Sequence, residues 1–152
     1  MTRKFDRWLI PLRGLVVASA GAFAVASMSA QADLSPRDAD SVRFAVQSQL
    51  AALAANDAVR AFSLATPDVQ QSFGNPEQFL AMVRAQYPMV QKPAMISFTR
   101  PETVGDRVMQ RVNITDESGA PWLVTYLLRR EGNNRWRISA CIVAPARPHV
   151  MA

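Results

Sequence analysis

The chain has 152 residues and a mass of 16.7 kDa, enough for one hydrophobic core but not for a second large domain. Apolar residues make up 49% and charged residues 19%, with 10 Pro and 6 Gly, a composition that excludes disordered and collagen-like chains. A single cysteine and a single histidine exclude an internal disulfide framework and a Cys- or His-rich metal site. We therefore expect neither a bound metal nor a cofactor.

Residues 1–32 have the pattern of a secretory signal peptide. A basic start is followed by an uncharged apolar run over residues 15–26 and by small residues that end in an A-x-A site at Ala32. Cleavage is predicted between Ala32 and Asp33, which would place the protein in the periplasm or outside the cell. The apolar run has about a dozen residues, fewer than the ~20 that span a bilayer, so no stable membrane insertion is expected after cleavage. An uncleaved signal anchor is the alternative.

Cleavage changes the charge of the protein. The segment holds four basic residues and one acidic residue, so the rest of the chain keeps 13 basic and 11 acidic residues and a net charge of +2, against +5 for the whole. The sequence pI of about 10.3 is thus partly a property of the leader. A charge this small does not support a nucleic-acid partner, and we expect none.

Helix signals dominate the chain as far as Pro88. Ser35 followed by Pro36 predicts a helix start, and an apolar stripe at three- and four-residue spacing carries that helix to about residue 55. Asp57 is expected to cap a second short helix, and Thr66-Pro67 to open a third. Asn75-Pro76 is the clearest start signal, for a helix that Pro88 is expected to stop.

After Pro93 the apolar period changes to two. Four strands are predicted, joined by polar turns and therefore antiparallel; they fall near residues 96–99, 108–115, 122–128 and 136–142. The expected fold is α+β, with N-terminal helices packed on a curved four-stranded antiparallel sheet in a single domain over 33–145, and a C-terminal tail over 146–152. The sheet face expected to meet the helices carries Phe98, Val112, Trp122, Tyr126, Trp136 and Ile138.

Four segments carry a family resemblance: Leu34-Ser35-Pro36, residues 73–84, Gln110-Arg111-Val112 and residues 136–141. Together they resemble the domain-of-unknown-function 4864 family of exported bacterial proteins, over nearly all of residues 34–145. The resemblance implies export and no established activity. The order of helices and strands is also similar to the nuclear-transport-factor-2-like (NTF2-like, or cystatin-like) architecture, in which helices pack into the concave face of a bent sheet.

An enzyme on such a fold would need a carboxylate or a histidine as general base inside a pocket between helices and sheet. Asp57 is better explained as a helix cap, and Asp106, Asp116 and Glu117 as turn residues. The one histidine, His149, lies in the Pro-rich tail. The sequence therefore favours a non-enzymatic domain that binds a small apolar ligand or a protein partner. A small-molecule isomerase, lyase or hydrolase using the pocket is the alternative.

The residues expected to contact such a ligand are the aromatic ones on the inner side: Tyr87, Tyr126, Trp122 and Trp136. Alternatively, they are ordinary core aromatics whose hydroxyl or indole N–H groups form hydrogen bonds with the backbone.

Strict alternation places three arginines on the opposite face of the sheet: Arg111, Arg129 and Arg137. They could form a basic patch for an acidic partner, or a solvated face with ion pairs to Glu131 or Glu117. The same alternation puts Cys141 on the face away from Trp136, where we interpret it as a small buried hydrophobe rather than a reactive thiol. Self-association into a homodimer is left open.

Overall fold

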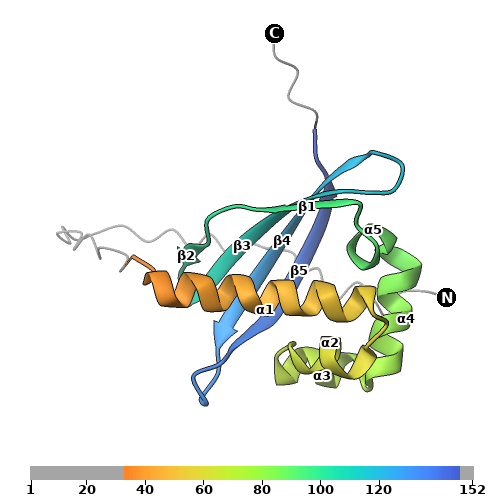
Figure 1. Cartoon of the computed structure of the whole chain (residues 1–152). Coiled ribbons are helices and arrows are strands. Elements are labelled where there is room, and N and C mark those ends of the chain that lie inside the picture. The colour runs from red at the N-terminus through yellow and green to blue at the C-terminus, as the bar shows by residue number, and fades with distance from the viewer. Residues whose placement is uncertain (1–32, 148–152) are drawn as a thin grey trace, which may run out of the picture.

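A computed structural model of the chain describes residues 33–147, in which a helical half precedes a meandering sheet (Figure 1). The predicted signal peptide with Ala32, and the tail from residue 148 with His149, lie outside the described residues. The elements in chain order are α1 (Pro36–Ala54), α2 (Ala58–Ser63), α3 (Pro67–Phe73), α4 (Pro76–Gln86), α5 (Pro88–Gln91), β1 (Met95–Phe98), β2 (Glu102–Val104), β3 (Arg107–Thr115), β4 (Pro121–Arg130) and β5 (Trp136–Pro145).

The four predicted helix starts are confirmed, and all but the one at Thr66 have a side-chain cap. The Ser35 hydroxyl accepts a hydrogen bond from the Asp38 N–H at 3.1 Å, and the Asn75 side-chain oxygen accepts one from the Gln78 N–H at 2.9 Å. Pro88 was expected only to stop a helix, yet it also opens α5, because proline suits the first position of a helix.

The sheet has five antiparallel strands rather than the four expected. Its order is β1-β3-β4-β5, and β2 pairs with β3 beyond the end of β1. The short β2 escaped prediction because three residues after Pro101 are too few to show an alternating pattern.

A β-bulge corrects the expected alternation in β5. Leu128 pairs with Ile138 but Leu127 pairs with Ala140, so Ser139 is an extra residue on its strand. Beyond the bulge every side chain changes face. Cys141 therefore lies in the core, 7% exposed and opposite Tyr126, and its predicted placement on the outer face was wrong, although it is buried as expected.

The core lies between the helices and one face of the sheet. Figure 1 shows α1 crossing that face, with α2 to α5 gathered around its C-terminal end. Val112, Tyr126 and Ile138 are fully buried as predicted, whereas Phe98, Trp122 and Trp136 are only partly buried at the margins of the core. Across residues 33–147, no helix combines the length and apolar character that a bilayer crossing requires.

Candidate functional site

The inner cavity, the space enclosed by the helices and the concave sheet face, is filled. Tyr87, Tyr126 and Cys141 meet there, as the aromatic pattern led us to expect for the two tyrosines. The remaining lining residues are Gln49, Leu53, Phe79, Val83, Val90 and Val143. The free volume is about 10 Å³, at the lower limit for a single water molecule.

Two ionisable groups of the inner cavity, Tyr126 and Cys141, are held neutral by burial. Burial raises the pKa of the Cys141 thiol to about 12, and burial together with the adjacent thiol raises the pKa of Tyr126 well above its usual value. The Tyr126 hydroxyl is fully buried and has no hydrogen-bond partner of normal geometry within residues 33–147. No carboxylate or histidine is among the described residues that line the cavity, so none of them offers a general base.

The two tryptophans predicted to share a site with these tyrosines lie elsewhere. Trp122 opens β4 opposite Pro145, whereas Trp136 opens β5 opposite Arg130, eight residues further along β4. At ~3.3 Å per residue this separates them by roughly 26 Å. The structure thus brings Tyr87 and Tyr126 together and places each tryptophan at a different end of the sheet.

Trp122 belongs to a turn. Its indole N–H donates a hydrogen bond to Asp116 at 2.8 Å, and the same carboxylate accepts bonds from Ser118 and from the Ala120 N–H in the β3–β4 connection. The Ser118 and Trp122 bonds, in that order, lower the pKa of Asp116 to about 2. Asp116 is therefore a structural acceptor, in agreement with its predicted role as a turn residue.

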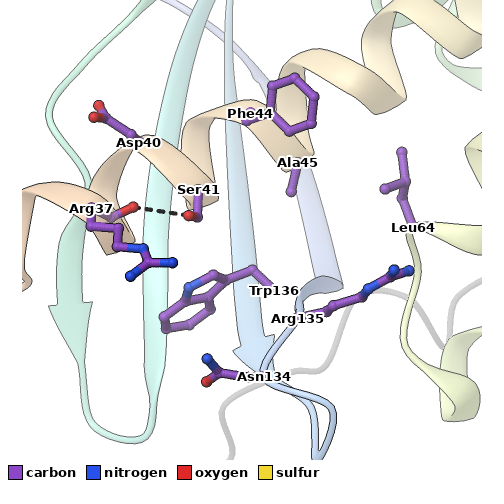
Figure 2. A pocket seen from close by; sticks show the side chains of 9 residues that line it. All are labelled: Arg37, Asp40, Ser41, Phe44, Ala45, Leu64, Asn134, Arg135 and Trp136. Carbon is purple, nitrogen blue, oxygen red and sulfur yellow. Dashed lines mark hydrogen bonds between the residues drawn. The ribbon is translucent and has the colours of Figure 1, made fainter.

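Trp136 lies in an open groove between the first half of α1, the end of α2 and the β4–β5 turn (Figure 2). We call this the Trp136 groove; it is lined by Arg37, Asp40, Ser41, Phe44, Ala45, Leu64, Asn134, Arg135 and Trp136. Its volume is about 790 Å³, inside the range of ~300–1,000 Å³ that small-molecule sites occupy.

The indole of Trp136 is fixed by two charged neighbours. Its N–H points to the Asp38 carboxylate at 3.5 Å, and the Arg130 guanidinium lies 4.8 Å from the ring centroid. Asp38 and Arg130 form an ion pair with each other. The Ser35 hydroxyl, and then Arg130 and Trp136, lower the pKa of Asp38, so it stays charged at neutral pH. The groove therefore has a preorganised aromatic wall.

Of the groove residues, the sequence analysis named Trp136 alone as a candidate ligand contact, and that role stays a prediction. One signal was available: Phe44 lies two residues after Val42 and therefore opposite the apolar stripe of α1. A phenylalanine on the polar side of an amphipathic helix suggests a contact outside the core, and Phe44 is 67% exposed.

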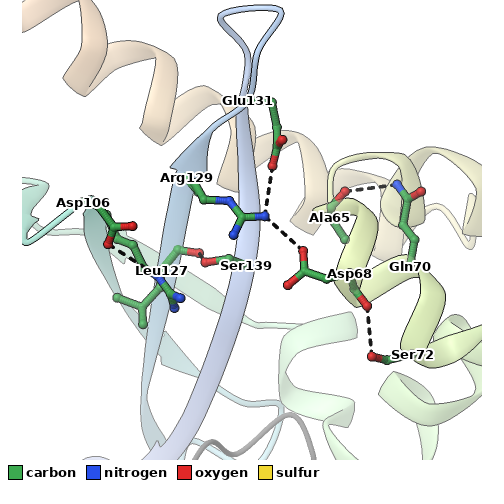
Figure 3. Close-up of polar contacts among 10 residues, drawn as sticks. Ala65, Asp68, Gln70, Ser72, Asp106, Leu127, Arg129, Glu131 and Ser139 are labelled. Atoms are coloured by element: carbon green, nitrogen blue, oxygen red, sulfur yellow. Dashed lines mark hydrogen bonds and ion pairs between the residues drawn. The ribbon is translucent and has the colours of Figure 1, made fainter.

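The three predicted outer arginines lie on the sheet face away from α1, and two of them have acidic partners. Arg111 is 3.8 Å from Glu102, and Arg129 lies between Asp68 at 3.1 Å and Glu131 at 3.4 Å (Figure 3). Arg137, which pairs with Arg129 across the strands, has no ion pair within residues 33–147. A role of this face in binding stays a prediction.

No three His, Cys, Asp or Glu side chains of the described part of the chain gather in a way that could hold a metal ion. Among the described residues, the aromatic candidates thus lie in a filled interior, in a turn and in an open surface groove.

The fold is NTF2-like. The crystal structure of a ketosteroid isomerase-like protein from Erwinia carotovora atroseptica SCRI1043 matches with a TM-score of 0.50 and 13% identity, over 75% of this chain and 100% of that chain. An NTF-2 like protein of unknown function from Burkholderia xenovorans LB400 matches with a TM-score of 0.48 and 18% identity, over 74% and 88%. At such identities the likeness concerns the fold alone.

The family is defined by sequence. The model described as Domain of unknown function (DUF4864) matches residues 35–151, so the chain belongs to this family, as the resemblance predicted. Among curated proteins none matches the chain.

Proposed function

We propose that this protein is an exported binding domain without catalytic activity, and that a small, largely apolar ligand, or an apolar segment of a partner protein, binds in the Trp136 groove. The observation that carries the proposal is a difference in volume between two aromatic-lined spaces. The groove offers about 790 Å³ beside a fixed indole, whereas the inner cavity offers about 10 Å³.

Binding in the groove would use side chains that folding leaves uncovered. Phe44 is 67% exposed, and a hydrophobic side chain of that size gains about 1.5–3 kcal/mol when fully buried. The Asp38–Arg130 pair keeps Trp136 in place before any ligand arrives, which lowers the entropy cost of binding.

The alternative function is an isomerase, lyase or hydrolase that acts in the interior. A ketosteroid isomerase-like protein has a similar fold. Such chemistry needs room for a substrate and a group that takes its proton. The described lining of the inner cavity supplies neither, since its ionisable groups are a tyrosine pair and a thiol with a pKa of about 12.

The binding proposal is tested with a neutral fluorescent probe, N-phenyl-1-naphthylamine, titrated into the purified protein. Phe44→Ser should weaken binding at least about fivefold by removing an apolar wall, whereas the matched control Val59→Ser should leave it unchanged. Val59 is 66% exposed but lies on α2, outside the groove lining. Binding that is absent, or equally affected by both substitutions, would overturn the proposal.

Export is proposed on the basic start, the short apolar run and the A-x-A site that precede Asp33. The intact mass of the protein isolated from its host tests it. A mass that corresponds to an N-terminus at Asp33 supports export with cleavage after Ala32. A mass that retains residues 1–32 would contradict cleavage.

A further inference from the structure

We propose that the ligand of the Trp136 groove is a small amphiphilic anion, a flat or chain-like apolar body that carries one carboxylate or phosphate group. This inference rests on the proposed function and adds the chemical class of the ligand. The charges of the groove support it independently of the groove's volume.

The groove presents its cations without acidic partners. Arg37 reaches it from α1 and Arg135 from the β4–β5 turn, so they approach from two walls. Neither forms an ion pair with a carboxylate of residues 33–147, in contrast to Arg129 and Arg130, which both do. Figure 2 shows the Arg37 guanidinium directed toward Trp136.

The acidic residue in the lining does not cancel these charges. Asp40 is the one carboxylate among the described lining residues, and in Figure 2 its side chain points away from Trp136. Asp38 is nearby but is engaged by Arg130, Ser35 and Trp136. The balance of the groove is therefore positive, and an anion gains charge-assisted hydrogen bonds there.

Asn134, in the β4–β5 turn next to Arg135, adds a further donor to the lining. The side-chain oxygen of Asn134 accepts a hydrogen bond from Arg130 at 3.1 Å, which leaves its NH₂ group to donate. The apolar body of the ligand would then pack on Phe44, Leu64 and the face of Trp136, while its head group meets Arg37 or Arg135. An apolar body and an anionic head are what this lining complements.

Two probes of nearly equal shape separate the charge from the apolar body. 8-Anilino-1-naphthalenesulfonate and N-phenyl-1-naphthylamine share their ring system, and the first alone carries a negative charge. The measured quantity is the ratio of their dissociation constants, in the parent protein and in variants. A substitution that alters only the apolar contacts changes both dissociation constants alike and leaves this ratio unchanged.

The double variant Arg37→Gln/Arg135→Gln should shift that ratio about tenfold or more against the sulfonate, with the neutral probe nearly unaffected. The control Lys92→Gln/Arg147→Gln removes the same charge from exposed residues that do not line the groove, and it should leave the ratio unchanged. A ratio that stays constant in the arginine variant, or that shifts equally in the control, would overturn the inference.

Competition separates the two head groups. Displacement of the sulfonate probe by 2-naphthoate, by 2-naphthyl phosphate or by both supports the inference and indicates the head group, whereas displacement by neutral 2-naphthalenemethanol alone would contradict it. Phe44→Ser keeps the two proposals apart. If it weakens both probes but the arginines do not alter the ratio, the groove remains the site and only the anion class fails.

Discussion

The inner cavity and the Trp136 groove are both built around aromatic residues, and they differ in what covers them. Around Tyr126 the helices close completely, and Phe79 packs against Phe62 and Phe73 with ring centroids 6.0 and 5.3 Å away. Around Trp136, α1 and the end of α2 leave the groove open, and Phe44 stays exposed in its lining. An aromatic side chain on a strand therefore becomes part of the core or the wall of an open groove according to the element that packs over it.

The largest expected effect is a loss of stability when the packing of the inner cavity is disturbed. Phe79→Ala should lower the free energy of unfolding by about 3–5 kcal/mol, because Phe79 is 1% exposed and its removal leaves a cavity. Phe44→Ala is the matched control and should stay within about 0.5 kcal/mol of the parent, since Phe44 is largely exposed. Urea denaturation measures both. Similar losses for the two would remove the distinction between cavity and groove.

The thiol of Cys141 reports whether the inner cavity is closed. With a pKa raised to about 12 and 7% exposure, it should react with 5,5′-dithiobis(2-nitrobenzoate) at pH 8 only when the protein opens. The rate in concentrated guanidinium chloride should exceed the native rate by at least about 100-fold. Fast reaction of the native protein would show that the interior admits small molecules.

The hydroxyl of Tyr126 distinguishes a packed core from a catalytic one. Because it is buried beside the Cys141 thiol with no hydrogen bond of normal geometry among residues 33–147, Tyr126→Phe should raise the free energy of unfolding by about 1 kcal/mol. Chemical denaturation measures the change. A loss of stability would mean that the hydroxyl has a bonded partner, either the Cys141 thiol or a water or ligand inside the cavity.

The smallest expected effect concerns acid stability at the Trp122 end of the sheet. The pKa of Asp116 is about 2 in the folded protein, below its usual 3.8, so its contribution to stability is complete above pH 4 and is lost as the pH falls toward 2. Asp116→Asn should lower Tm at pH 7 and make the fall in Tm between pH 4 and pH 2 shallower. Glu117→Gln, at the exposed neighbouring carboxylate, is the control and should keep the parent pH profile.

Local signals in the sequence predicted most of the fold. The caps at Ser35, Asp57 and Asn75 act through side chains three residues from their partners, so short stretches of sequence contain the whole interaction. The bulge at Ser139 and the short strand β2 depend on pairing with other strands, and no local pattern reveals them.

The groove could be predicted only in part for the same reason. Asp38 and Trp136 are 98 residues apart in sequence and meet only after the β4–β5 turn folds back onto α1. Trp136 was named as a candidate because it alternates with core residues. Arg37 and Arg135 have no such signal, and only the fold places them on one groove.

The central claim is that ligands bind in the Trp136 groove and not in the interior. Chemical-shift mapping of the ¹⁵N-labelled protein with N-phenyl-1-naphthylamine tests it most directly. We expect the largest shifts at Phe44, at Arg135 and at the indole N–H of Trp136, with the amides of Tyr126 and Cys141 unchanged. The largest shifts at Tyr126 and Cys141, with Trp136 unaffected, would contradict the account.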